Sequence, residues 1–313
     1  MEPVKKLVLV FCIILTLTLI FAGDLQAADF GLFDDYQFMA GAMYTRPEMS
    51  GFTEFFEGEY GAMADENQVF ADLLDNFNGE DFEGAEMSGY SFRYNTDYPS
   101  GPMDSFGVYL NLINSTEFGY RALLNYDLFR LDFNARGNNE LSVKFDGDFE
   151  NYNEAELIYE NSSEIDVEML IHSFGAEYHF PFFSGIDNQL PDLLRFFNFN
   201  VGGAYYWGYG EMTSSEYKLE QLIGEDSYGD PVDRRYESSS ENSYDLTLAG
   251  SPGYKVGVGF DYPLQQGMMV SAGVNYRVLE MDIETSGNGD EIIGDMTEDF
   301  SGLEMKLGLF YQF

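Results

Sequence analysis

The chain finishes with the eleven residues LEMKLGLFYQF, Leu303 to Phe313, in which polarity changes at almost every step. Apolar side chains stand at every second position, namely Leu303, Met305, Leu307, Leu309, Tyr311 and Phe313. A period of two places these side chains on one face of a β-strand. The other face then carries Glu304, Lys306, Gly308, Phe310 and Gln312. The stretch therefore predicts a last strand with one apolar face.

The spacing within this stretch carries a further signal. Lys306, Gly308, Tyr311 and Phe313 form the pattern polar, any, glycine, any, any, aromatic, any, aromatic. This pattern resembles the closing-strand assembly signal of bacterial outer-membrane β-barrel proteins. The resemblance implies an all-β protein built as a closed antiparallel transmembrane β-barrel. It also implies location in the outer membrane, contact with lipid and lipopolysaccharide, and an outer-membrane assembly machinery as the partner during biogenesis.

The first residues have the features of an export signal. Lys5 and Lys6 precede an apolar run from Leu7 to Ala22, and a small residue, Ala27, stands at the expected cleavage point. This order is typical of a cleaved signal peptide. The alternative is a membrane anchor, but the run has sixteen residues, whereas a membrane-spanning helix needs about 20. We expect residues 1–27 to be removed and residues 28–313 to form one domain, which would contain no cysteine and hence no disulfide.

The composition narrows the class of protein. A net charge of -40 argues against nucleic acid as a partner. The mean hydropathy of -0.24 fits a barrel, because only alternate residues of its strands face lipid. An aromatic content of 17%, with 23 Tyr and 29 Phe, is what aromatic girdles at two membrane interfaces require. An exported, aromatic-rich β-sandwich is the soluble alternative. The acidity is also compatible with a high-salt habitat.

Alternation predicts about ten strands, with eight or twelve as alternatives. The segment from Phe118 to Phe133 changes its apolar parity once, which indicates a bulge in one strand or a tight turn between two. Acidic segments are predicted as long extracellular loops, and short turns as periplasmic connections. The predicted strands are 36–46, 90–95, 106–112, 118–133, 141–145, a strand that ends near 180, 197–209, 254–262, 270–278 and 303–313. The predicted long loops are 47–87, 148–168, 211–244 and 286–299.

Charged residues opposite the apolar faces are predicted to point into the barrel. Seven bases and five acids share this position, which is near balance. Side chains can fill a barrel of about eight to ten strands, so we expect a plugged or very narrow lumen closed by ion pairs. A narrow, wet cation channel is the alternative. The predicted lumen-facing residues are Arg93, Arg121, Arg130, Asp132, Lys144, Asp146, Glu177, Lys255, Asp261, Arg277, Glu304 and Lys306.

The predicted function is that of a monomeric surface protein for structure or interaction. The alternatives are a small passive pore for cations or small solutes and, more weakly, a surface hydrolase near His172. No nucleophile–base pair is visible, since Ser173 directly follows His172 and faces the other way. No catalytic residue, resident metal or cofactor is predicted. The acidic loops are candidates for diffuse binding of divalent cations.

Overall fold

The computed structural model is all-β and forms one large antiparallel sheet. It describes residues 36–61, 65, 67–69, 71–72, 81–82, 85–115, 121–149, 152–182, 192–226, 228–264, 268–287 and 296–311. The predicted export signal and Phe313 lie outside these ranges. None of the helices in the described ranges has the length and hydrophobicity that a membrane-spanning helix requires.

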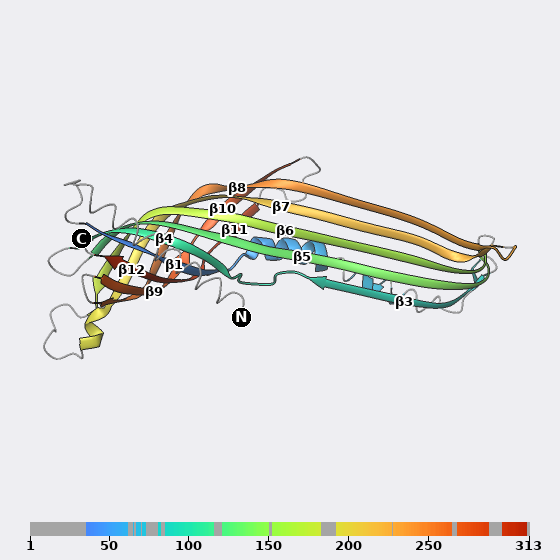
Figure 1. The fold of residues 1–313 in the computed structure, drawn as a ribbon, viewed down its shortest axis with the longest axis horizontal. Coiled ribbons are helices and arrows are strands. Elements are labelled where there is room, and N and C mark those ends of the chain that lie inside the picture. The colour runs from blue at the N-terminus through green and yellow to red at the C-terminus, as the bar shows by residue number, and fades with distance from the viewer. Residues whose placement is uncertain are drawn as a thin grey trace.

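Eight strands of the sheet close into a ring. Each pairs with the next in an antiparallel manner, and the last strand of the chain pairs with both the preceding strand of the ring and the first one, which closes the circle. The terminal strand predicted from the alternation is thus the closing strand of this ring (Figure 1). In ring order the strands are β1 (Tyr36–Pro47), β4 (Ser105–Ser115), β5 (Arg121–Phe149), β6 (Tyr152–Pro181), β7 (Phe197–Asp226), β8 (Pro231–Pro263), β9 (Met268–Val278) and β12 (Gly302–Tyr311).

The ring has eight strands, which is one of the alternatives to the expected count of about ten, and the difference has two reasons. The predicted strands 118–133 and 141–145 are one continuous strand, β5, so Gly137 and its neighbours form no turn. The predicted strand 90–95 belongs to β3 (Ala85–Asp97), which pairs with the far end of β5 and lies outside the ring. Merging 141–145 with 118–133 and leaving out 90–95 reduces the ten predicted strands to the eight observed in the ring.

Four strands continue far beyond the ring. β5, β6, β7 and β8 have 29 to 33 residues each, and β3 extends their sheet at one side (Figure 1). From Tyr209 to Asp226, β7 advances by about 55 Å beyond the ring at about 3.3 Å per residue. We call this five-stranded part the extension. The predicted loops 148–168 and 211–244 are therefore mainly strands.

Short elements complete the sheet at several levels, from the mouth of the ring to the far end of the extension. β10 (Glu280–Gly287) pairs with β8, and β11 (Met296–Asp299) pairs with β10, so strands occupy part of the predicted loop 286–299. β2 (Asp81–Phe82) pairs with the start of β3. A 3-10 turn, Asp192–Phe196, precedes β7.

A short helix closes the mouth of the ring on the side of the extension. α2 (Ser50–Phe56) continues into a π-helical turn, Glu57–Gly61, and its Phe52 and Phe56 are fully buried. Both rings pack edge-on against Phe133 of β5. Within the predicted loop 47–87, the spacing of Val69, Leu73, Leu74 and Phe77 predicts a short amphipathic helix. Residues 67–69 and 71–72 are helical, whereas Leu73, Leu74 and Phe77 lie outside the described ranges.

The predicted bulge between Tyr126 and Phe129 is absent. Pairing of β5 with β4 and β6 runs without a register shift through this segment. Phe129 and Leu131 therefore point into the ring, where both are fully buried. The interior itself changes from polar to apolar at this level, and this change, rather than a slip of the strand, explains the altered pattern.

Two glycines shape the seam between the first and last strands. Gly41 of β1 and Gly308 of β12 are direct partners, and the buried ring of Tyr109 lies over both. A Cβ at Gly308 would lie 2.2 Å from the Tyr109 hydroxyl oxygen, and a Cβ at Gly41 would lie 2.5 Å from its ring. Glycine at position 308 is thus required by the approach of an aromatic side chain.

We expect Gly308→Val to destabilise the ring by about 1–3 kcal/mol, the usual cost of forcing extra atoms into a packed interior. The midpoint of urea unfolding measures this effect. In the matched change Gly273→Val on β9, the new Cβ would have its nearest neighbouring atoms at 3.8 Å, so this change should cost less. Equal midpoints for the two variants would show that Tyr109 does not determine the residue at 308.

Candidate functional site

A charged layer crosses the interior of the ring, with Asp127 at its centre. The Asp127 carboxylate lies 2.8 Å from the Lys306 ammonium and 3.4 Å from that of Lys255. Lys255 also lies 2.9 Å from Glu177. β5 is not adjacent to β8 or β12 in the ring, so these contacts span the interior. The layer therefore ties opposite walls together.

The layer continues towards the helix through Glu304 and Arg277. Glu304 contacts Lys306 at 3.4 Å and Arg277 at 3.6 Å. The fully buried guanidinium of Arg277 donates to the Phe300 carbonyl and the Thr45 hydroxyl, and it lies 4.5 Å from the centre of the Phe129 ring. Three acids thus face three bases. A balanced set avoids the high cost of an unpaired buried charge.

Seven predicted lumen-facing residues lie inside the ring: Arg121, Glu177, Lys255, Asp261, Arg277, Glu304 and Lys306. Arg121 and Asp261 form a second ion pair, at 2.5 Å, to which Asn198 adds a hydrogen bond. Sequence reasoning missed Asp127, because the assumed slip left its face undefined. Simple continuation of the alternation from Tyr126 would have placed it inside.

Five predicted residues are placed elsewhere. Arg130 and Asp132 are exposed on the outer face, since the parity of β5 does not change, and there Arg130 pairs with Asp132 and Glu168. Arg93, Lys144 and Asp146 lie on the extension, where no lumen exists, and are exposed. The prediction was wrong for Arg130 and Asp132 because it assumed a change of parity in β5, and for Arg93, Lys144 and Asp146 because it assumed that every strand belongs to the ring.

Two cavities lie among the described residues of the ring. A cavity of about 20 Å³ lies beside Tyr109, Asn111 and His179, which is room for about one water molecule. A second cavity of about 180 Å³ lies at the mouth opposite the helix, lined by Arg121, Arg195 and Asp261 among others. In the described part of the ring, the charged layer and the buried apolar side chains beneath α2 occupy the interior.

The two histidines have different surroundings on opposite faces of β6. His172 faces outward, accepts or donates a hydrogen bond of 2.7 Å with the Tyr126 hydroxyl, and stacks on Trp207. His179 faces inward and lies 2.9 Å from Glu177. Within the described ranges, no group of three or more His, Asp or Glu residues could hold a metal ion. His172 is therefore part of an aromatic cluster on the outer surface.

A buried carboxylate fixes α2 to the sheet. Glu298 of β11 is fully buried and accepts hydrogen bonds from the backbone N–H groups of Gly51 and Phe52, at 3.0 and 2.6 Å, and of Asp299, at 2.8 Å. Burial raises the pKa of Glu298 from 4.5 to about 7, although these three hydrogen bonds favour the charged form. The contact joins the helix to the edge of the sheet at a single ionisable group.

This contact predicts a stability that falls as the pH rises. The folded state holds the Glu298 proton more tightly than the unfolded state, so stability is lost between pH 4.5 and 7, by about 3 kcal/mol at about 1.36 kcal/mol per unit. Urea unfolding from pH 4 to 8 measures this loss. Glu298→Gln is the control, because an amide does not titrate. A constant difference between the two proteins across this range would contradict the prediction.

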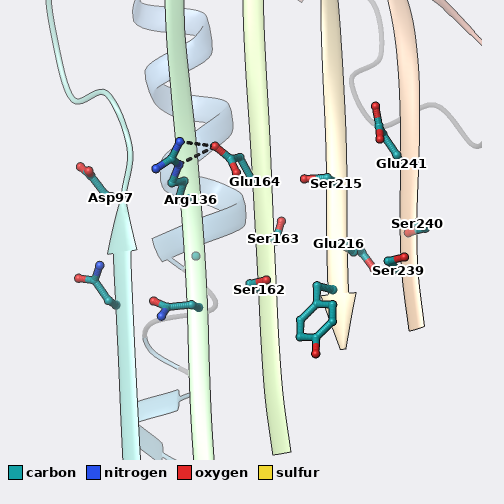
Figure 2. A pocket seen from close by; sticks show the side chains of 14 residues that line it. Asp97, Arg136, Ser162, Ser163, Glu164, Ser215, Glu216, Ser239, Ser240 and Glu241 are labelled. Carbon is teal, nitrogen blue, oxygen red and sulfur yellow. Dashed lines mark hydrogen bonds and ion pairs between the residues drawn. The ribbon is translucent and has the colours of Figure 1, made fainter. Parts of the chain in front are cut away.

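The outer face of the extension is hollowed across all five strands (Figure 2). The hollow has a volume of about 760 Å³, and its lining residues are almost all polar. Ten of its fourteen lining residues, Ser162 and Glu164 among them, have outward parity and so lie on the face opposite the Ser163 hydroxyl, which contacts Tyr60 of the helical segment. Gly137, Ser163, Glu216 and Ser240, of inward parity, also border the hollow. Nothing in the sequence indicated this site, since most of its lining residues fall in 148–168 and 211–244, which were predicted as loops.

No protein-family model matches this chain, and no curated protein matches it significantly. The function is therefore inferred from the ring, its filled interior and the extension.

Proposed function

We propose that the protein is an outer-membrane β-barrel that anchors a long, acidic β-sheet at the cell surface for contact with a partner. The observation that carries this proposal is the combination of a ring apolar on its outside, charge-balanced on its inside, and extended on one side only. Each part supports a different element of the proposal.

The outer face of the ring supports insertion into a bilayer. The outward positions of β7 from Phe199 to Tyr209 are Phe, Val, Gly, Tyr, Trp and Tyr. This segment covers about 33 Å at about 3.3 Å per residue, and a tilt of about 40° reduces it to about 25 Å, the height of a barrel's apolar band. Exposed aromatic side chains such as Tyr178, Trp207 and Tyr262 match the girdles at the two interfaces.

Charges begin abruptly where this band ends. The next outward positions after the band form a row of directly paired residues, Asp132, Glu168, Glu211 and Asp245. Of the eight outward positions of β6 from Glu154 to Glu168, six are acids. Such a surface suits water rather than lipid, which supports an extension that projects from the membrane.

The filled interior favours an anchor over a pore. The ion pairs of Asp127, Lys255 and Lys306 cross the ring, and α2 covers its mouth. Passage of an ion would require both layers to move.

Conductance in a planar bilayer tests the proposal. We expect the purified, folded protein to insert and to remain electrically silent. Discrete cation-selective steps would instead make it a pore. Failure to insert into lipid vesicles, judged by flotation, would overturn the membrane assignment. Added protease should remove the extension from intact cells and leave the ring protected, whereas an extension resistant until the outer membrane is opened would reverse the orientation.

A further inference from the structure

The hollow on the outer face of the extension contains a row of uncharged side chains. Asn95, Asn138, Ser162, Tyr217 and Ser239 are consecutive cross-strand partners on β3, β5, β6, β7 and β8. We call these five residues the neutral row. Five strands spaced by about 4.8 Å make this row about 19 Å long.

The groups of the neutral row are available to a ligand. Among the described residues, no hydrogen bond is made by the side chains of Asn95, Asn138, Ser162 or Ser239. Tyr217 donates a long one, of 3.4 Å, to Glu237. Amides and hydroxyls both donate and accept hydrogen bonds. The row therefore offers alternating donors and acceptors without a net charge.

The next row disfavours anionic ligands. It consists of Asp97, Arg136, Glu164, Ser215 and Glu241, again as direct cross-strand partners (Figure 2). Its only base, Arg136, already donates to the Glu164 carboxylate, at 2.6 Å from Nε and 2.5 Å from Nη2. The remaining charges are acids, which repel phosphate, sulfate and carboxylate groups.

The lining also disfavours lipid. No aliphatic or phenylalanine side chain lines the hollow within the described ranges, and the Tyr217 ring is the one large apolar surface among these lining residues. Burial of an acyl chain would therefore gain little, because the hydrophobic contribution scales with apolar area removed from water. A ligand that fits this hollow is uncharged, elongated and rich in hydroxyl groups.

We propose that the hollow binds a neutral glycan chain across the strands, along the neutral row. The proposal rests on the proposed function in that the extension must face the exterior to meet such a chain. The chain could belong to a membrane glycolipid or be a free oligosaccharide, since both present the same hydroxyl groups.

The test uses the full protein in micelles of a sugar-free detergent, because glycoside detergents would compete. It is screened against an array of neutral, sialylated and sulfated oligosaccharides, and against a lysine-rich peptide as a probe for simple attraction to acids. We expect binding to a subset of neutral glycans that persists in about 0.5 M salt, since hydrogen bonds between neutral groups are not screened. Binding to no glycan, a preference for anionic glycans, or binding of the peptide alone would overturn the proposal.

Two variants localise the site. Ser162→Tyr fills the centre of the hollow at a position where tyrosine suits a strand, and it should weaken binding at least about tenfold, the equivalent of one or two lost hydrogen bonds. Ser91→Tyr is the matched control on the same outer face, because Ser91 does not line the hollow. Equal affinities of the two variants would place the glycan elsewhere.

A comparison with cells separates the two proposals. Binding to the purified protein but not to intact cells that display it would retain the site and reject the outward orientation. Insertion and surface exposure without any glycan binding would retain the outward orientation and reject the glycan site. Micelles with a free oligosaccharide and vesicles with purified lipopolysaccharide distinguish the two sources of the chain.

Discussion

Lys255→Met should destabilise the ring by about 3–5 kcal/mol, the usual cost of removing one partner from a buried ion pair. Lys255 is almost completely buried between Asp127 and Glu177, at 3.4 and 2.9 Å. Methionine fills a similar volume but leaves Glu177 with His179 as its remaining partner among the described residues, so a nearly uncompensated charge stays in the interior. The midpoint of urea unfolding in lipid vesicles measures the loss.

Two further variants show whether charge is the cause. Lys255→Met combined with Glu177→Gln restores the balance of the layer and should recover part of the lost stability. Lys218→Met removes an exposed partner of Glu216 on the extension, 3.6 Å away, and should change stability by about 0–1 kcal/mol. If Lys255→Met unfolds at the same urea concentration as Lys218→Met, the interior is hydrated and the sealed layer does not exist.

Phe56→Ala should destabilise the protein by about 3–5 kcal/mol, as expected for truncating a fully buried aromatic side chain. The Phe56 ring lies 6.1 Å from that of Phe133 and 6.2 Å from that of Phe52, so its loss leaves a cavity between α2 and β5. Urea unfolding gives the size of the effect, and hydrogen exchange of the α2 amides shows that the helix has loosened.

Phe56→Ala also shows whether the charged layer or the apolar packing at α2 seals the ring. We expect Phe56→Ala to remain silent in a planar bilayer, because the ion pairs around Asp127 still cross the ring below the helix. Val69→Ala, at a helical position that is 60% exposed, is the control and should change stability by less than about 0.5 kcal/mol. Open channels in Phe56→Ala would show that the helix alone seals the ring.

Alternation along the chain is enough to assign the inward face of most ring strands. It is strict in 254–262 and 270–278 and is interrupted once, at Phe310, in 303–313, and a period of two places every second side chain on one face. Lys255, Arg277, Glu304 and Lys306 could therefore be assigned to the interior from the residue pattern. The all-β class follows from the same pattern, and the closing position of the last strand was implied by the resemblance of its final residues.

The remaining features depend on how the strands come together in space. Alternation identifies a strand only where one face is buried and the other is not. The inward face of the extension is apolar only in parts, and on β7 it carries Glu216, Lys218 and Glu220, so 148–168 and 211–244 resemble acidic loops in composition. Parity also assigns a face but not a partner: that Asp127 meets both Lys255 and Lys306 depends on how eight strands close and stagger. The apolar layer at Phe129 and Leu131 arose in the same way, because α2 covers that end of the ring and excludes water from it.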